Sequence, residues 1–148
     1  TYSRSSGDLF INQIDDAGNW TVLESTNIGT GYDQLVDLGT QKEVRGGICC
    51  YTIGGGFMAY DKDSDRLRVY VVENGDHDVT LRRTYNTSGW VFDILAQVQG
   101  NKFIAYRDDN NQMYVGGMDE LGQWYWNSGH IVGAAYQNYY RILTLSFR

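Results

Sequence analysis

The chain has 148 residues, of which 42% are hydrophobic and 14% aromatic, and its formal net charge is −6. The length suits one compact domain with a single core. The acidic balance argues against nucleic-acid binding and against adhesion to anionic lipid, because both need clustered Lys and Arg. No apolar run approaches the ~20 residues of a membrane helix, so we expect no membrane insertion.

Glycine and aromatic residues are frequent: the chain has 18 Gly, 12 Tyr, 4 Trp and 5 Phe, and it has no Pro. This composition favours strands joined by tight turns, because aromatic side chains suit pleated surfaces and glycine adopts turn conformations. No segment shows sustained helical periodicity. We therefore expect an all-β fold.

An internal repeat is anchored on three tyrosines, Tyr2, Tyr60 and Tyr106. Each is followed after seven residues by Leu or Met, after thirteen by an acid and after thirty by an aromatic residue. The acids are Asp15, Glu73 and Asp119, and the aromatic residues are Tyr32, Trp90 and Tyr136. Fixed spacing over three copies indicates one domain, 1–148, with repeats of approximately 1–55, 56–100 and 101–148.

Each repeat predicts four antiparallel strands separated by polar or glycine-bearing turns. In chain order, the strands are expected at Trp20–Glu24, Gly56–Tyr60, Leu67–Val72, Val79–Thr84, Val91–Val98, Lys102–Tyr106, Met113–Met118, Trp124–Asn127 and Tyr139–Ser146. The longer first repeat adds a loop around Lys42–Gly55 that carries an extra strand, Ile48–Ile53. The acids at the repeated turn position are expected to shape hairpin turns.

The end of the chain continues the repeat into its beginning. Phe147 and Arg148 followed by Thr1 and Tyr2 reproduce the Phe-x-x-Tyr pattern of residues 57–60. We therefore expect the C-terminal segment to supply the missing half of a strand in the first repeat. A ring of repeats closed in this way leaves no open sheet edge.

Three segments resemble the repeats of propeller lectins, including the fucose-binding and tachylectin-like families. They are Leu67–Gly75 with Gly89 and Trp90, Met113–Trp124, and Tyr32–Gly39. The resemblance implies three four-stranded β-propeller blades, completed by oligomerisation, with two copies making a six-bladed homo-oligomeric ring. A β-trefoil with three lobes remains the alternative, although its Gln-x-Trp signature is absent.

Catalytic and metal-binding patterns are weak in this sequence. The two histidines, His77 and His130, occupy different repeat positions, which does not favour a metal site or a Ser-His-Asp arrangement. Asp61, Asp63 and Asp65 alternate in a turn, but a solvated turn is favoured over a calcium site. The third copy has only Asp108 and Asp109 there, the first copy has Ser3 to Gly7, and the Gly and terminal Glu of an EF-hand are missing. We therefore expect no enzyme activity, no metal and no cofactor.

The supply of aromatic side chains with polar neighbours predicts a carbohydrate-binding, lectin-like module for glycans or glycoproteins. The candidate ligand-binding residues are Trp20, Tyr32, Asp33, Arg68, Trp90, Trp124, Trp126 and Tyr136. The resemblance to fucose-binding propellers implies a sugar contact for Arg68. Tyr32, Trp90 and Tyr136 could equally be core residues. The alternative function is a protein-interaction or receptor-binding domain of a larger assembly.

The location of the protein stays open, with an extracellular protein favoured and a cytoplasmic one as the alternative. Two glycosylation sequons begin at Asn19 and Asn86 and would matter only on a secretory route. The adjacent Cys49 and Cys50 are interpreted as two small strand residues, because neighbouring cysteines rarely bridge to each other.

Overall fold

A computed structural model describes residues 1–99, 102–107, 109–110 and 112–131. Within these ranges the chain is all-β, as expected, and contains no helix that could cross a membrane. The strands are β1 (Asp8–Ile14), β2 (Trp20–Asn27), β3 (Gln34–Arg45), β4 (Ile48–Asp61), β5 (Arg66–Glu73), β6 (Val79–Asn86), β7 (Ile94–Gln99), β8 (Lys102–Arg107), β9 (Gln112–Met118) and β10 (Trp124–Ile131).

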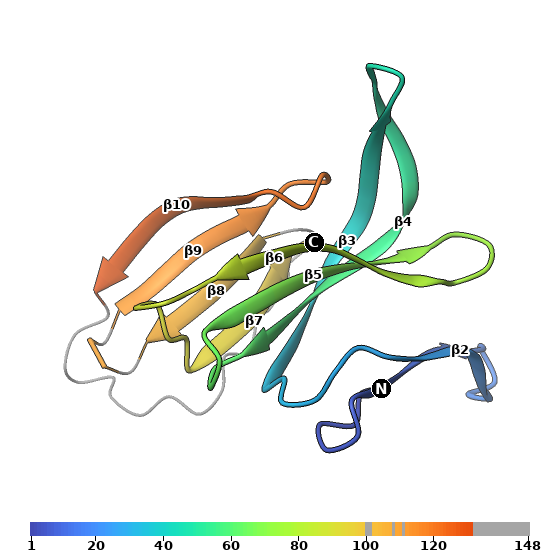
Figure 1. The fold of residues 1–148 in the computed structure, drawn as a ribbon, viewed down its shortest axis with the longest axis horizontal. Helices are drawn as coiled ribbons and strands as arrows, with labels where there is room; N and C mark the ends of the chain where they lie inside the picture. Colours follow the sequence, from blue (N-terminus) through green and yellow to red (C-terminus); the bar gives the residue numbers. More distant parts are fainter. Residues whose placement is uncertain (100–101, 108, 111, 132–148) are drawn as a thin grey trace.

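The strands form three antiparallel sheets that follow one another in chain order (Figure 1). The first sheet contains β1 and β2, the second contains β3 to β6, and the third contains β7 to β10. In the second and third sheets each strand pairs with its neighbour in the sequence, which gives two four-stranded meanders. Four consecutive strands per sheet is the arrangement found in propeller blades.

The three anchor tyrosines occupy the same place in three hairpins. Tyr2 pairs with Leu9, Tyr60 with Leu67, and Tyr106 with Met113. The tyrosines precede the third strand of the second and third sheets. These sheets begin two strands earlier, at β3 and β7, which start 26 residues before Tyr60 and 12 residues before Tyr106. The expected strand at 139–146 and the junction at Phe147 lie outside the described residues.

The aromatic residue that precedes each sheet is Tyr32 or Phe92, and not Trp90. The backbone N–H of Asp33 donates to Tyr60 O at 2.8 Å, and that of Asp93 donates to Tyr106 O at 2.9 Å. Trp90 is shifted because the β5–β6 hairpin and the loop after β6 are each one residue longer than their counterparts around β2. Because of these two single-residue insertions, the equivalent of Tyr32 is Phe92, two residues beyond the thirty-residue position that Trp90 occupies.

The extra residues of the first repeat form a projecting arm, residues 42–53. Strands β3 and β4 contain 12 and 14 residues, whereas β7 and β8 contain 6 each. Figure 1 shows the arm extending away from the sheets. Its tip is a turn at Gly46 and Gly47, which have φ values of +56° and +78°. The expected extra strand at 48–53 is present, as the beginning of β4.

The second sheet buries both of its faces. Alternation along β5 places Leu67, Val69 and Val71 on one face and Arg68 and Tyr70 on the other. The core between the second and third sheets is Val36, Leu38, Met58, Tyr60, Leu67, Val69, Phe92, Leu95, Phe103, Ala105 and Met118. The core between the first and second sheets is Leu9, Ile28, Tyr32, Ala59 and Tyr70. Each large apolar side chain buried here contributes about 1.5–3 kcal/mol.

A partly buried set of polar contacts, the Arg82 joint, holds the base of the arm to the third sheet. Arg82 on β6 donates to Gln41 Oε1 and to Glu120 O, both at 3.1 Å, and also to Lys42 O. Lys42 Nζ lies 2.7 Å from Glu120 Oε2. Burial lowers the pKa of Arg82, and three oxygen acceptors from two segments, residues 41–42 and Glu120, satisfy its guanidinium. Gly56 leaves the room that the fully buried Gln41 occupies.

Two of the three repeated acids, Asp15 and Asp119, shape turns as expected, whereas the Glu73 carboxylate accepts from the Thr80 hydroxyl on β6 at 3.3 Å. Asp15 Oδ1 accepts the N–H groups of Ala17 and Asn19 at 3.0 and 2.8 Å. Asp119 Oδ1 accepts those of Leu121 and Gln123 at 2.9 and 2.7 Å. These carboxylates satisfy backbone donors that the hairpin leaves unpaired.

The β4–β5 turn is organised by a buried carboxylate, Asp61. Its Oδ1 accepts the N–H groups of Asp63 and Ser64 at 3.1 Å, and its Oδ2 accepts from the Ser64 hydroxyl at 2.5 Å and from Arg66 at 3.4 Å. Burial raises the pKa of Asp61, but the hydrogen bonds from Ser64 and Arg66 outweigh it, so the pKa is below its ordinary value.

Substitution of Gly54 is expected to destabilise the second sheet. A Cβ on Gly54 would lie 1.8 Å from Val72 O, a backbone atom of β5 that cannot move independently. We expect Gly54→Ala to cost about 1–3 kcal/mol and to lower Tm by several degrees. Gly55→Ala is the matched control, because no heavy atom lies within 4 Å of a Cβ there. Equal Tm values for the two variants, measured by circular dichroism, would contradict this packing.

Replacement of Asp61 is expected to have a pH-dependent effect on stability. A carboxylate with a lowered folded-state pKa stabilises the fold above its unfolded pKa of about 3.9, and this contribution is lost as the pH falls through the folded pKa. Asp61→Asn should therefore cost about 1–3 kcal/mol at pH 7, and the difference from wild type should shrink below about pH 4. Urea unfolding at pH 7, 5, 4 and 3 measures this. Asp63→Asn, which alters an exposed carboxylate, should change the free energy of unfolding little. A loss of stability in Asp61→Asn that does not vary with pH would refute the prediction.

Candidate functional site

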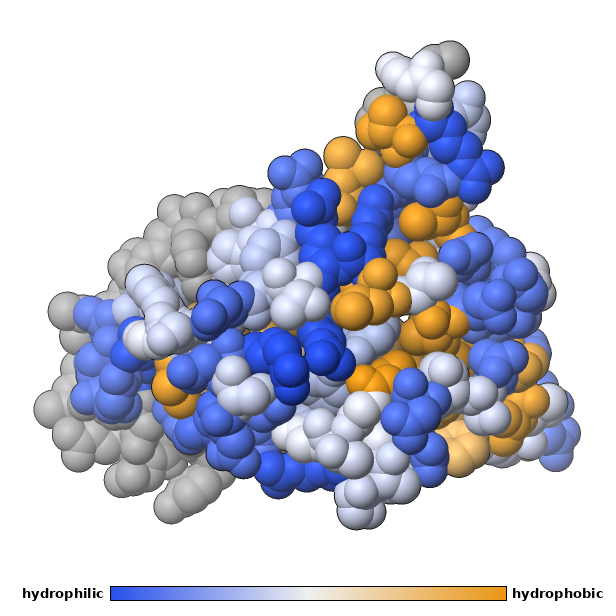
Figure 2. Space-filling view, in the orientation of Figure 1, coloured by the Kyte–Doolittle hydropathy of each residue, from blue (hydrophilic) through white to orange (hydrophobic). Residues whose placement is uncertain are grey.

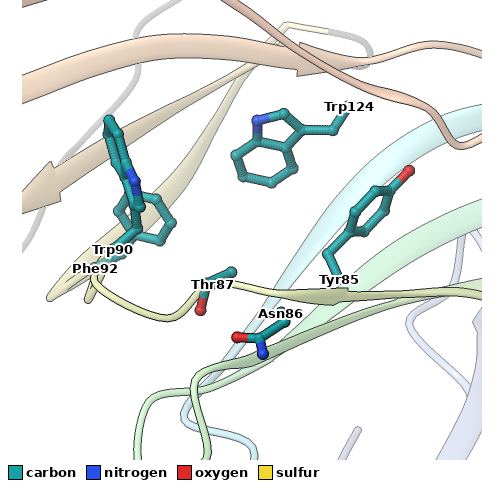
Figure 3. Close-up of a pocket in the computed structure, with 6 residues that line it drawn as sticks. All are labelled: Tyr85, Asn86, Thr87, Trp90, Phe92 and Trp124. Carbon is teal, nitrogen blue, oxygen red and sulfur yellow. The ribbon is translucent and has the colours of Figure 1, made fainter.

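A pocket of about 350 Å³ lies where the second and third sheets meet. Its lining consists of Tyr85 and Asn86 from β6, Thr87, Trp90 and Phe92 from the loop before β7, and Trp124 from β10. Figure 3 shows Trp90 and Phe92 on one side, Tyr85 on the opposite side and Trp124 between them. Four of the six lining residues are aromatic.

The aromatic walls of the pocket are held by contacts with the core. The ring of Trp124 lies 4.8 Å from that of Phe103, 6.3 Å from that of Phe92 and 6.3 Å from that of Tyr85, measured between centroids. The Tyr85 hydroxyl donates to Gly122 O at 2.7 Å. These contacts fix the shape of the pocket before any ligand binds, which lowers the entropic cost of binding.

Trp90 forms the exposed rim of the pocket, with 41% of its surface accessible. Its ring lies 5.2 Å from that of Tyr114, nearly perpendicular, and the Arg107 guanidinium lies 5.4 Å from its centroid. Arg107 is itself paired with Asp109 at 2.5 Å, and this hydrogen bond raises the pKa of Arg107. Trp90 is therefore oriented by a cation–π contact although it faces solvent.

The polar side of the pocket comes from Asn86 and Thr87. Asn86 Oδ1 accepts the backbone N–H of Ser88 at 2.8 Å. The buried Thr87 hydroxyl makes no hydrogen bond of regular geometry within the described residues. It lies close to Tyr60, whose pKa is raised by burial against the opposing effects of the Phe92 N–H and the Thr87 hydroxyl. The pocket thus combines apolar walls with a small number of hydrogen-bonding groups.

A row of charged groups lies at the starts of β3 and β7. Lys62 Nζ lies 2.5 Å from Asp93 Oδ1, and the Lys62 backbone N–H donates to Asp33 Oδ2 at 2.8 Å. Arg4 lies 2.7 Å from Asp33 Oδ1. The hydrogen bond with Asp93 raises the pKa of Lys62 and keeps the amine charged. Asp93 directly follows Phe92 of the pocket.

Tyr32 and Arg68, two of the expected ligand-binding residues, meet between the first and second sheets. Arg68 Nη1 donates to the Tyr32 hydroxyl at 2.6 Å, and the Tyr32 and Tyr70 hydroxyls are hydrogen-bonded at 3.0 Å. Tyr70 also donates to Ile28 O at 3.1 Å. Burial is the main cause that raises the pKa of Tyr32, which is only 2% exposed. This network therefore links the first and second sheets through hydrogen bonds inside the molecule.

The expected site residues are therefore divided among several places. Trp90 and Trp124 share the pocket, Tyr32 and Arg68 share the internal network, and Asp33 belongs to the charged row. Trp20 lies on the first sheet, where its indole N–H donates to Asn12 Oδ1 at 2.9 Å. Trp126 belongs to β10, but its side chain and all of Tyr136 lie outside the described residues.

Four lining residues of the pocket were not expected from the sequence: Tyr85, Asn86, Thr87 and Phe92. Phe92 could have been found from the aromatic–Asp pair that it forms with Asp93, which matches Tyr32 and Asp33. Nothing in the spacing distinguishes the other three, because they face the pocket only once the two sheets have packed.

No protein-family model and no curated protein matches the sequence. Two solved structures are similar in fold. A protein from Lactobacillus plantarum is 14% identical with a TM-score of 0.50, over 90% of this chain and 39% of that chain. The periplasmic gluconolactonase of Pseudomonas aeruginosa is 14% identical with a TM-score of 0.49, over 87% of this chain and 35% of that chain. The chain thus spans well under half the length of either protein.

These comparisons are consistent with a β-propeller-like arrangement of the sheets. They correct the expected lectin-like function, because the one of the two with a stated function is a gluconolactonase. They also contradict the expectation that the chain is not an enzyme, because one of the two is described as a gluconolactonase. At 14% identity the likeness itself concerns the fold alone.

Proposed function

We propose that the chain forms part of a β-propeller that acts on a small molecule, and that the aromatic pocket receives the flat, apolar face of that molecule. The second and third sheets would be two blades, and the first sheet would be part of another. Meander sheets packed face to face support blades over trefoil lobes.

The pocket between the two sheets carries this proposal. Its volume of about 350 Å³ is within the range of small-molecule sites. Trp90 and Trp124 offer ring faces for stacking beside the buried Phe92, while Asn86 offers its side-chain amide at one side. A ligand with a fused ring and a carbonyl oxygen would satisfy both kinds of surface.

Hydrolysis of such a ligand is the second candidate function, favoured by the Lys62–Asp93 pair beside Phe92. Asp93 is a carboxylate that Lys62 orients, and it would serve as the general base. It would take a proton from water as the water oxygen attacks an ester or lactone carbonyl. The bond between the carbonyl carbon and the leaving oxygen then breaks, and the departing alkoxide, or phenoxide in an aryl ester, takes up the proton from Asp93.

Binding at the pocket is expected to depend on Trp90. Dihydrocoumarin, an aromatic lactone, provides a flat face and a carbonyl acceptor and should quench tryptophan fluorescence saturably. We expect Trp90→Leu to weaken its affinity about two- to tenfold, because one aromatic contact contributes about 0.5–1.5 kcal/mol. Trp20→Leu removes an exposed tryptophan on the first sheet and should leave the affinity unchanged. Equal affinities in Trp90→Leu and wild type would exclude this pocket as the binding site.

Hydrolysis is expected to depend on Asp93 without affecting binding. If Asp93 is the general base, Asp93→Asn should slow hydrolysis of dihydrocoumarin about 100-fold or more, as measured by acid release at constant pH. The quenching titration should still give the wild-type affinity, which also shows that the variant is folded. Asp33→Asn, at the corresponding position immediately before β3, is the matched control and should retain activity. Undiminished hydrolysis in Asp93→Asn would remove Asp93 from the reaction.

A further inference from the structure

One face of the first sheet exposes a cluster of large apolar side chains. Ile14 is 60% exposed, Trp20 55%, Val22 53% and Phe10 38%. Phe10, Asn12 and Ile14 alternate along β1, and Trp20 and Val22 lie opposite Ile14 and Asn12 on β2, so these residues share a face. Figure 2 shows hydrophobic surface on the side of the molecule where the first sheet lies. Exposed apolar groups gathered in this way mark an interaction surface.

In the second and third sheets, the residues at the equivalent positions contact a neighbouring sheet. Trp20 pairs with Ile14 as Trp124 pairs with Met118 and as Val79 pairs with Val72. Met118 is fully buried against the second sheet. Trp124 also packs on that core, and Val79 packs on the core beneath the first sheet. This face is therefore covered by a neighbouring sheet twice in the molecule, and it is exposed on the first sheet.

The third sheet has a face equivalent to the one with which the second sheet receives it. In the second sheet, Met58, Leu67 and Val69 form the face that receives the third sheet, and they are completely buried. The corresponding residues of the third sheet are Ile104, Met113 and Val115, because they occupy the same places in the β8–β9 pairing. These three are only half-buried. The third sheet can thus accept another sheet in the way that the second sheet accepts it.

We propose that the exposed face of the first sheet packs against the third sheet of a second copy of this chain. Trp20 would enter between the two sheets as Trp124 does within one chain. A hollow of about 200 Å³ beside Phe10, Ser25 and Asn27 lies on the same face and would receive a side chain of the partner. The two contacting surfaces differ, so the contact is heterologous and closes into a ring when the rotation per copy permits.

Polar groups on this face already have hydrogen-bond partners, so a sheet can cover the face without leaving them unpaired. The indole N–H of Trp20 is already bonded to Asn12, so burial would leave no unpaired donor there. The nearest carboxylate on the face, Asp8, accepts from Asn27 at 3.0 Å, and hydrogen bonds from Ser6 and Asn27 lower its pKa. The apolar centre of the face therefore has a polar end whose groups are already satisfied, as in other protein interfaces.

Light scattering after size exclusion tests the proposal. At tens of micromolar, we expect the wild-type mass to be an integer multiple, two or more, of 16.8 kDa. The double variant Trp20→Lys, Val22→Lys should have the mass of a single chain with unchanged circular dichroism. Val44→Lys is the matched control, because Val44 is 51% exposed but lies on the arm, and it should assemble like wild type. A monomeric wild type, or assembly that survives the double variant, overturns the proposal.

A mixing experiment tests whether the contact joins the first sheet to the third. Ile104→Lys alters only the receiving face and should also prevent self-assembly. Mixed with the Trp20→Lys, Val22→Lys protein, it should form a heterodimer, because its first sheet and the third sheet of the other variant are both unaltered. The Trp90→Leu variant should assemble normally, which separates this contact from the proposed ligand pocket. If two self-assembly-deficient variants fail to associate when mixed, the heterologous contact is refuted.

Discussion

The contact of Trp124 with Phe103, Phe92 and Tyr85 joins the third sheet to the second, and the candidate site depends on it. Trp124 is the first residue of β10, so it is positioned by the turn that Asp119 organises. Its ring closes the core on one side and forms a wall of the pocket on the other. The Arg82 joint then prevents the β9–β10 turn from moving away from the arm. Structural stability and pocket shape therefore depend on the same group of side chains.

Local structure was largely predictable from the sequence, because hairpins are determined by residues close together in the chain. The spacing from Tyr60 to Leu67 and from Tyr106 to Met113 is a strand-pair register, and the acids at 15 and 119 cap the turns as expected. The grouping of strands into sheets was harder to predict, because the tyrosines fall in the middle of a sheet. The equivalence of Tyr32 with Phe92 was concealed by two single-residue insertions.

The candidate site was only partly predictable, because counting aromatic residues does not distinguish a core from a pocket. Tyr32 and Arg68 carried the resemblance to lectin repeats, yet the structure places them in a hydrogen-bonded link between two sheets. Trp90 was treated as the equivalent of Tyr32 in the second repeat, but it lies at the rim of the pocket, in contact with Arg107. Tyr85 and Thr87 acquire their role only through tertiary packing. Sequence spacing carries no information on such contacts.

The arm at residues 42–53 has a tip that can be altered independently of its base. Its tip, Gly46 and Gly47, has open space around both residues, whereas its base is fixed by Arg82 and Lys42. Exposed turns with small residues tolerate inserted sequence well. The tip is accordingly a suitable position for a short epitope or a fluorescent label. A reporter placed there would follow the protein through purification and imaging while the six pocket residues stay in their natural surroundings.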